Sequence, residues 1–97
     1  MNLEKRKMLS VVVSVYNEEA VLEAFYAETV KVLEHLVWDY ELIYVNDGSA
    51  DGSMEILRRQ AMRNDRVKVI CFSRNFGHEA AMIAGIDHAT GDGIVCM

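Results

Sequence analysis

Residues 40–53 are Tyr-Glu-Leu-Ile-Tyr-Val-Asn-Asp-Gly-Ser-Ala-Asp-Gly-Ser, a largely apolar run that ends abruptly in small polar residues. The first six have the length and the composition of a β-strand. The Asn, Asp, Gly and Ser residues that follow favour turns and helix N-caps. Apolar residues then recur at helical spacing up to about Arg63. This stretch therefore predicts a strand, a polar loop and a helix.

The same succession is found on both sides of this unit. Residues 9–15 form a β-branched run, and residues 20–35 place apolar side chains on one helical face. A strand is predicted at residues 67–72, an Ala-rich helix at 78–89 and the start of another strand at 94–97. The order βαβαβαβ predicts an α/β fold with three layers, αβα, in which helices cover both faces of a parallel sheet.

The last predicted strand stops with the chain, in the apolar run of residues 93–97. A buried parallel strand would lack one neighbour there, so we expect residues 1–97 to be a single partial domain, truncated from a larger one. Unpaired strand edges pair readily with other chains. We therefore expect self-association through the exposed edge.

Composition excludes several functional classes. The net charge of -5 argues against nucleic acid as a partner, because phosphate binding needs clustered Lys and Arg. The apolar run at residues 8–15 is too short for a membrane span and has no signal-peptide cleavage site. These features predict a cytoplasmic chain, and Cys71 and Cys96 are interpreted as reduced core residues because both lie in apolar runs.

The informative loops are those that follow the strands, because parallel sheets of this kind bind ligands outside the carboxyl ends of their strands. After the second predicted strand, Asp47, Gly48 and Ser49 supply a carboxylate, a flexible backbone and a hydroxyl. That set suits recognition of a base or a ribose. The alternative is an ordinary turn, in which Ser49 or Asp51 only starts the next helix.

Two further loops follow strands at the same predicted edge. Glu18 could accept hydrogen bonds from ribose hydroxyls while Tyr16 covers a ring, although Asn17 could instead make this segment a simple helix cap with acidic residues that favour the helix dipole. Arg74 could meet a diphosphate or pair with Asp47. An ordinary loop salt bridge is the alternative for Arg74.

Several motifs are absent from the sequence. It contains neither G-x-G-x-x-G after the first strand nor a P-loop, so neither the dinucleotide fingerprint nor the ATPase phosphate loop is present. Its three histidines do not have metal-ligand spacing, so no metal ligand is predicted. Only His78, beside the predicted turn at Gly77, is kept as a functional candidate.

Three ordered motifs together resemble family 2 glycosyltransferases with the GT-A fold. They are Val-Val-Val-Ser-Val-Tyr-Asn-Glu at 11–18, Glu-Leu-Ile-Tyr-Val-Asn-Asp-Gly-Ser-Ala-Asp-Gly-Ser at 41–53, and Ser-Arg-Asn-Phe-Gly-His-Glu-Ala-Ala at 73–81, followed by Ala-Thr-Gly-Asp at 89–92. The resemblance covers the chain from Leu9 on. The segment at 73–77 is similar to members that load a polyprenyl phosphate, such as dolichol-phosphate mannose synthases and bactoprenol glucosyltransferases.

The resemblance implies that this chain is the Rossmann-like, nucleotide-sugar-binding half of such an enzyme. It implies a contact of Asp47 with the base, and a position of Arg74 near the donor. The other implied nucleotide-binding residues line the pocket, lie against the nucleoside or complete the loop: Ser14, Tyr16, Glu18, Val45, Gly48 and Ser49. Two residues depart from the family pattern, Ser14 in place of a usual proline and Asn46 in place of the first residue of a frequent Asp-Asp pair.

The resemblance also implies a D-x-D motif that binds Mg or Mn directly after the fourth strand, beyond Met97. The catalytic carboxylate and the acceptor site are expected there too, so no catalytic residue is predicted in this chain. We expect the parent enzyme to transfer a hexose from a UDP- or GDP-sugar to a polyprenyl phosphate at the cytoplasmic face of the membrane, and the fragment alone to be inactive.

Two other functions stay open at this point. The first is a non-catalytic nucleotide-binding or assembly module. The second is a nucleotidyltransferase of related architecture, which would need a basic, Gly-rich loop after the first strand. That function is disfavoured because residues 16–19, Tyr-Asn-Glu-Glu, carry the opposite charge.

Overall fold

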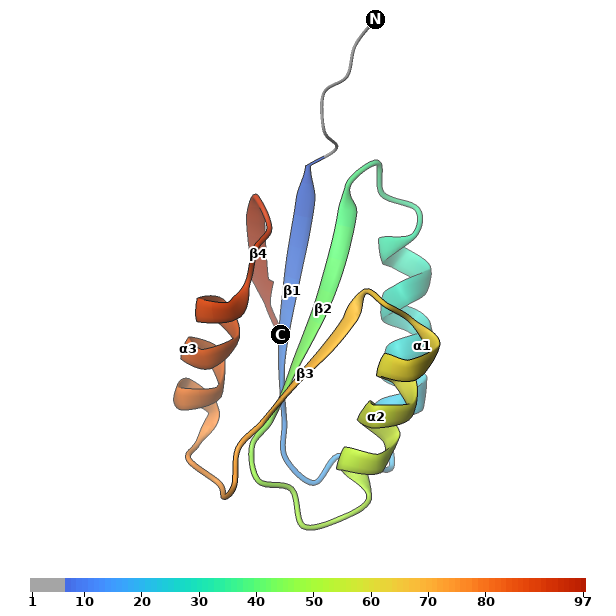
Figure 1. Ribbon diagram of the computed structural model, residues 1–97. Helices are drawn as coiled ribbons and strands as arrows, with labels where there is room; N and C mark the ends of the chain where they lie inside the picture. Colours follow the sequence, from blue (N-terminus) through green and yellow to red (C-terminus); the bar gives the residue numbers. More distant parts are fainter. Residues whose placement is uncertain (1–6) are drawn as a thin grey trace, which may run out of the picture.

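The computed structural model describes residues 7–97 and confirms the predicted order of elements (Figure 1). Each predicted boundary lies within two residues of the observed one. The elements are β1 (Met8–Val15), α1 (Leu22–Leu33), β2 (Asp39–Asn46), α2 (Ser53–Arg63), β3 (Val67–Cys71), α3 (His78–His88) and β4 (Gly93–Cys96).

All strands of the sheet are parallel, in the order β3-β2-β1-β4. The two central strands pair along their whole length, from Met8 opposite Asp39 to Val15 opposite Asn46. Helices α1 and α2 lie on one face of the sheet and α3 lies on the other (Figure 1). The predicted three-layer αβα architecture is therefore confirmed.

The core consists of two apolar layers, one on each side of the sheet. Alternate residues of β1 and β2, such as Val13 and Leu42, pack under α1 and α2 together with Leu57. The intervening residues, such as Ile43 and Val45, pack against Ala81 of α3. Because successive strand residues point to opposite faces, covering both faces buries most residues of β1 and all but the first residue of β2.

Two local predictions are wrong. Asn17 does not cap α1, which begins at Leu22 after Val21 and has no side-chain cap. Asn17 instead has a positive φ of 52°, and its amide oxygen accepts a hydrogen bond from the Ala50 N–H at 2.8 Å. Asn tolerates this conformation better than most residues, so Asn17 connects two loops.

The two cysteines are free, but they are exposed and not in the core. Cys71 ends β3 and Cys96 ends β4, and these are the two outer strands of the sheet. The apolar runs correctly predicted strands. They could not show which strands are central and covered by helices on both faces.

Helix α1 and strands β1 and β4 enclose an apolar groove of about 670 Å³. Its lining includes the exposed side chains of Val32, Val95 and Met97, which are 63%, 43% and 54% exposed. Within residues 7–97, β4 pairs with β1 alone, so its outer side is an open strand edge. The predicted exposed edge is thus present at β4.

Candidate functional site

The loops that follow β1, β2 and β3 meet at the carboxyl edge of the sheet, as expected for a parallel sheet. Backbone hydrogen bonds hold the three strand ends level. The Asp47 N–H donates to the Val15 carbonyl at 2.8 Å, and the Phe72 N–H donates to the Asn46 carbonyl at 2.9 Å. All the predicted site residues therefore lie at the ends of neighbouring strands or in the loops that follow them.

Side chains of the second loop accept hydrogen bonds from the backbone of the first loop. The Ser49 hydroxyl accepts from the Asn17 N–H at 3.0 Å, and the Ser53 hydroxyl accepts from the Glu18 N–H at 3.0 Å. One Asp51 carboxylate oxygen accepts from the Glu19 N–H at 3.2 Å. These contacts fix the backbone that carries Tyr16 and Glu18.

Asp51 also stabilises the turn before α2, the alternative role predicted from the sequence for this segment. Its other carboxylate oxygen accepts from the N–H of Ser53, the first residue of α2, at 2.9 Å. Hydrogen bonds from Ser53 and from the backbone of Glu19 lower the pKa of the Asp51 carboxyl, so it is ionised at neutral pH. The turn interpretation therefore holds for Asp51, whereas Ser49 braces the first loop.

The Asp47 carboxylate, only 3% exposed, holds the third loop in place. One oxygen accepts from the Phe76 N–H at 2.7 Å. The other accepts from the Gly77 N–H at 3.0 Å and from the Asn75 side-chain amide at 3.1 Å. Hydrogen bonds to a charged acceptor are stronger than neutral ones, so Asp47 orders residues 75–77.

Arg74 does not pair with Asp47 in this structure. Its guanidinium lies over the Phe76 ring, 4.5 Å from the ring centroid. Both side chains are exposed, with Phe76 at 50%. An exposed cation stacked on an aromatic face stays available to an anionic ligand, as the diphosphate role predicted for Arg74 requires.

The second and third loops touch backbone to backbone at Gly48. Gly48 has a φ of 70°, and a Cβ built on it would overlap backbone atoms of Arg74 and Asn75. Glycine satisfies both requirements at once, because it adopts positive φ without strain and needs no space for a side chain. Together Asp47 and Gly48 join the two loops into one surface.

Ser14 and Glu18 line a pocket of about 180 Å³ at the end of β1, together with Met97. The Ser14 hydroxyl is also 2.6 Å from the His78 Nδ1 at the start of α3. Tyr16 lies outside the pocket and is 48% exposed. Val45 is fully buried under α3, so it supports the loop from inside the core.

The structure adds residues that the sequence did not identify as site residues. Asn75 and the backbone of Phe76 and Gly77 contact Asp47, and Asn17 connects the first two loops. A polar residue in a loop between a strand and a helix is a weak signal for Asn75. No sequence signal indicates backbone donors, since every residue except proline carries one.

This arrangement provides groups that can contact the parts of a nucleotide. Exposed aromatic side chains at Tyr16 and Phe76 can cover a base, the Glu18 carboxylate can accept from ribose hydroxyls, and Arg74 can meet a phosphate. The ordered loops hold these groups on one edge. Binding of a nucleotide is therefore the chemistry that the geometry favours.

Residues 7–97 contain no helix that is long and apolar enough to cross a bilayer. In the same span, no group of three or more His, Cys, Asp or Glu side chains could hold a metal ion. The Mg or Mn that the resemblance implies is expected to take its ligands beyond Met97, so this finding leaves that expectation untested.

Comparison with known proteins identifies one family. Residues 10–97 match the family described as Glycosyl transferase family 2. The chain is 51% identical, over 89% of its length, to an uncharacterised glycosyltransferase of Bacillus subtilis (strain 168). It is 43% identical over 90% of its length to the prophage bactoprenol glucosyl transferase homolog of Escherichia coli (strain K12). The chain spans 27% and 28% of these two relatives.

A solved structure shares the fold. It is the mannosyltransferase PcManGT from Pyrobaculum calidifontis, in complex with GDP-Man and Mn2+. The TM-score is 0.78 at 23% sequence identity, and the match covers 93% of this chain and 26% of that one. At that identity the likeness supports the fold alone.

Proposed function

This chain belongs to glycosyl transferase family 2, and from that membership we propose that it is the donor-nucleotide half of a hexosyltransferase. The whole protein would transfer a hexose from a UDP- or GDP-sugar to a polyprenyl phosphate at the cytoplasmic face of the membrane. Relatives named bactoprenol glucosyl transferase, 43% and 41% identical to this chain, support the lipid acceptor. Because the chain spans about a quarter of their length, these residues alone would bind the donor without transferring the sugar.

The joining of three loops at the carboxyl edge is the observation that carries this proposal. Ser14 and Glu18 share one pocket. Asp47 and Gly48 tie the loop of Arg74 to the second loop, which in turn holds the loop of Glu18 through Ser49. In the proposed complex Glu18 and Ser14 lie against the nucleoside, Tyr16 lies over a ring, and Arg74 lies near the diphosphate. The metal expected for the whole enzyme, Mg or Mn, would take its ligands from elsewhere in the protein.

The proposed contact of Asp47 with the base has a structural consequence. The carboxylate is buried, and it already accepts three hydrogen bonds from residues 75–77. A ring N–H of a base could reach the carboxylate only if the loop shifts, or if one carboxylate oxygen accepts from the base and from the loop together. We therefore expect donor binding to move residues 73–77.

The test is an NMR titration of the chain with UDP, GDP and NAD. UDP or GDP should shift the backbone amides of residues 16–19, 46–53 and 73–78, and NAD should not. Asp47→Asn keeps the shape but loses an ionised acceptor, so it should weaken binding by about tenfold or more. Glu55→Gln, which removes an exposed carboxylate on α2, is the control and should bind as the native chain does.

Two results would contradict the proposal. If no nucleotide shifts the loop amide signals, the chain does not bind a donor nucleotide and has only a structural role. A response to NAD equal to that for UDP and GDP would favour a general nucleotide-binding module. A non-catalytic module that binds UDP or GDP is tested separately, by assaying sugar transfer to a polyprenyl phosphate with the full-length protein.

We also propose that the isolated chain associates with a second copy through the open edge of β4 and the adjoining apolar groove. Apolar groups leave water on contact, and the unpaired strand edge gains hydrogen bonds. Size-exclusion chromatography with light scattering should show a mass that rises with concentration. Val95→Lys places a charge in the groove and should restore the monomer. A native chain that stays monomeric at high concentration would refute this association.

A further inference from the structure

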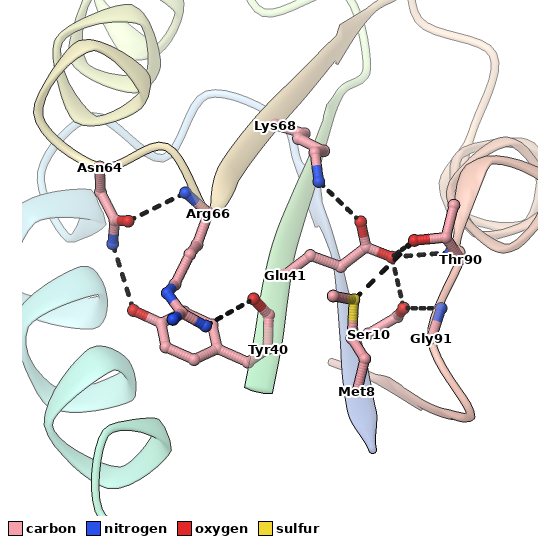
Figure 2. A network of polar contacts seen from close by, with 9 residues as sticks. All are labelled: Met8, Ser10, Tyr40, Glu41, Asn64, Arg66, Lys68, Thr90 and Gly91. Carbon is pink, nitrogen blue, oxygen red and sulfur yellow. Dashed lines mark hydrogen bonds and ion pairs between the residues drawn. The ribbon is translucent and has the colours of Figure 1, made fainter. Parts of the chain in front are cut away.

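A buried carboxylate, Glu41, lies toward the amino end of β2, away from the candidate site. Its side chain is 1% exposed, although a carboxylate is normally solvated. Figure 2 shows that it points toward β1 and the turn between α3 and β4. None of the contacts described above for the candidate site involves Glu41.

Both oxygens of Glu41 accept hydrogen bonds. One accepts from the Ser10 hydroxyl at 2.5 Å, from the Thr90 N–H at 2.7 Å and from the Thr90 hydroxyl at 3.1 Å. The other accepts from the Lys68 ammonium at 2.9 Å. The Ser10 hydroxyl in turn accepts from the Gly91 N–H at 2.9 Å (Figure 2). The carboxylate therefore joins three strands to the turn before β4.

The same turn is clamped to the start of β1 by a second set of contacts. The Asp92 N–H donates to the Met8 carbonyl at 2.7 Å, and the Asp92 carboxylate accepts from the Met8 N–H at 2.8 Å. A Cβ on Gly91 would come within 2.8 Å of the Met8 carbonyl oxygen. Residues 90–92 thus lie close against β1 and Glu41.

Strand β4 depends on this turn because it has few other contacts. It pairs with β1 over four residues, from Leu9 opposite Gly93 to Val12 opposite Cys96, and most of its side chains are exposed. Directly after it, the Met97 N–H donates to the Val12 carbonyl at 2.8 Å. Met97 then lines the pocket that holds Ser14 and Glu18.

We propose that Glu41 is a positioning residue for the donor site, which anchors the turn at residues 90–92 and so sets where β4 places Met97 beside Ser14 and Glu18. The inference deepens the proposed function and rests on it for the identity of the pocket. Glu41 itself touches no part of that pocket. Its effect is transmitted along β4, from the amino edge of the sheet to the carboxyl edge.

The experiment compares amide hydrogen exchange in the native chain and in Glu41→Gln. Glutamine has the shape of glutamate but no charge. Its NH2 group is a donor, and it would face the three donors of Ser10 and Thr90 that now converge on one Glu41 oxygen. Exchange at residues 93–97 should quicken by about tenfold or more relative to β2 and β3, because a strand held by few contacts opens locally. Glu55→Gln, which removes a carboxylate paired with Arg58 on the surface, should leave the pattern unchanged.

A second readout is the nuclear Overhauser contact between the Met97 methyl group and the side chains of its pocket, which should weaken in Glu41→Gln. Thr90→Val is the milder variant if Glu41→Gln does not fold. It removes one donor at an exposed residue and should produce a smaller change in the same amides.

The inference is overturned if exchange rises evenly across the sheet, or if β4 loosens while the Met97 contacts persist. Both measurements are made without nucleotide. A failure of the chain to bind UDP or GDP would therefore refute the proposed function and leave this result standing.

Discussion

Gly48→Ala is expected to destabilise the chain by about 3 kcal/mol and to abolish the junction between the second and third loops. A non-glycine residue at a φ of 70° costs about 1 kcal/mol or more. The added methyl group would also overlap backbone atoms of Arg74 and Asn75, and forced overlap costs about 1–3 kcal/mol. Backbone cannot rotate away as a side chain can, so the two loops must separate.

Urea unfolding of Gly48→Ala, followed by circular dichroism, measures the stability loss, and the amides of residues 73–78 report the loop. Gly52→Ala is the matched control. Gly52 has an ordinary φ of −79°, and a Cβ there would meet only the flexible Glu19 carboxylate. If both variants lose the same stability, the overlap at Gly48 is not the cause. Unchanged loop amides in Gly48→Ala would contradict the predicted separation.

The fold was predictable because its signals are local and repeated. The strand at residues 40–45 is nearly continuous apolar sequence, and the turn residues after it mark where the next helix starts. Three such alternations leave few topologies other than a parallel sheet. The exposure of Cys71 was not predictable in this way, because the rank of a strand within the sheet is set by long-range pairing.

The sequence predicted where the candidate site lies, at the carboxyl edge of the sheet, but not the contacts that form it. The rule that ligands bind after parallel strands correctly predicted that Glu18, Asp47 and Arg74 lie in neighbouring loops at one edge. It did not show that Asp47 accepts from backbone N–H groups of Phe76 and Gly77. Those donors are chosen by the path of the chain, which the residue types at 73–77 do not specify.

Glu41 is a similar case, although the sequence carries a clearer signal for it. A carboxylate within the apolar strand at residues 40–45 is costly to bury and must have partners. Those partners, Ser10, Lys68 and Thr90, lie 31, 27 and 49 residues away along the chain. Sequence alone indicates that such a residue needs donors, and the fold decides which residues supply them.

The stability of the chain is expected to fall by about 3 kcal/mol between pH 6 and pH 2 because of Glu41 alone. Burial raises the pKa of this carboxyl. Hydrogen bonds from Ser10, Thr90 and Lys68 outweigh burial and lower the pKa from 4.5 to about 2. In the unfolded chain the group titrates near its ordinary value, so above about pH 5 it is ionised in both states and its hydrogen bonds contribute fully. As the pH falls toward 2, the unfolded state takes up the proton first and is favoured.

Urea unfolding of the native chain and of Glu41→Gln across this pH range measures the effect. Glu23 and Asp51 also have lowered pKa values, and they contribute the same slope to both proteins. The difference between the two curves therefore isolates Glu41. It should be largest at pH 6 and shrink by about 3 kcal/mol at pH 2, where the native carboxyl becomes protonated. Parallel curves would mean that Glu41 has the same pKa folded and unfolded, which four donors around a buried carboxylate do not allow.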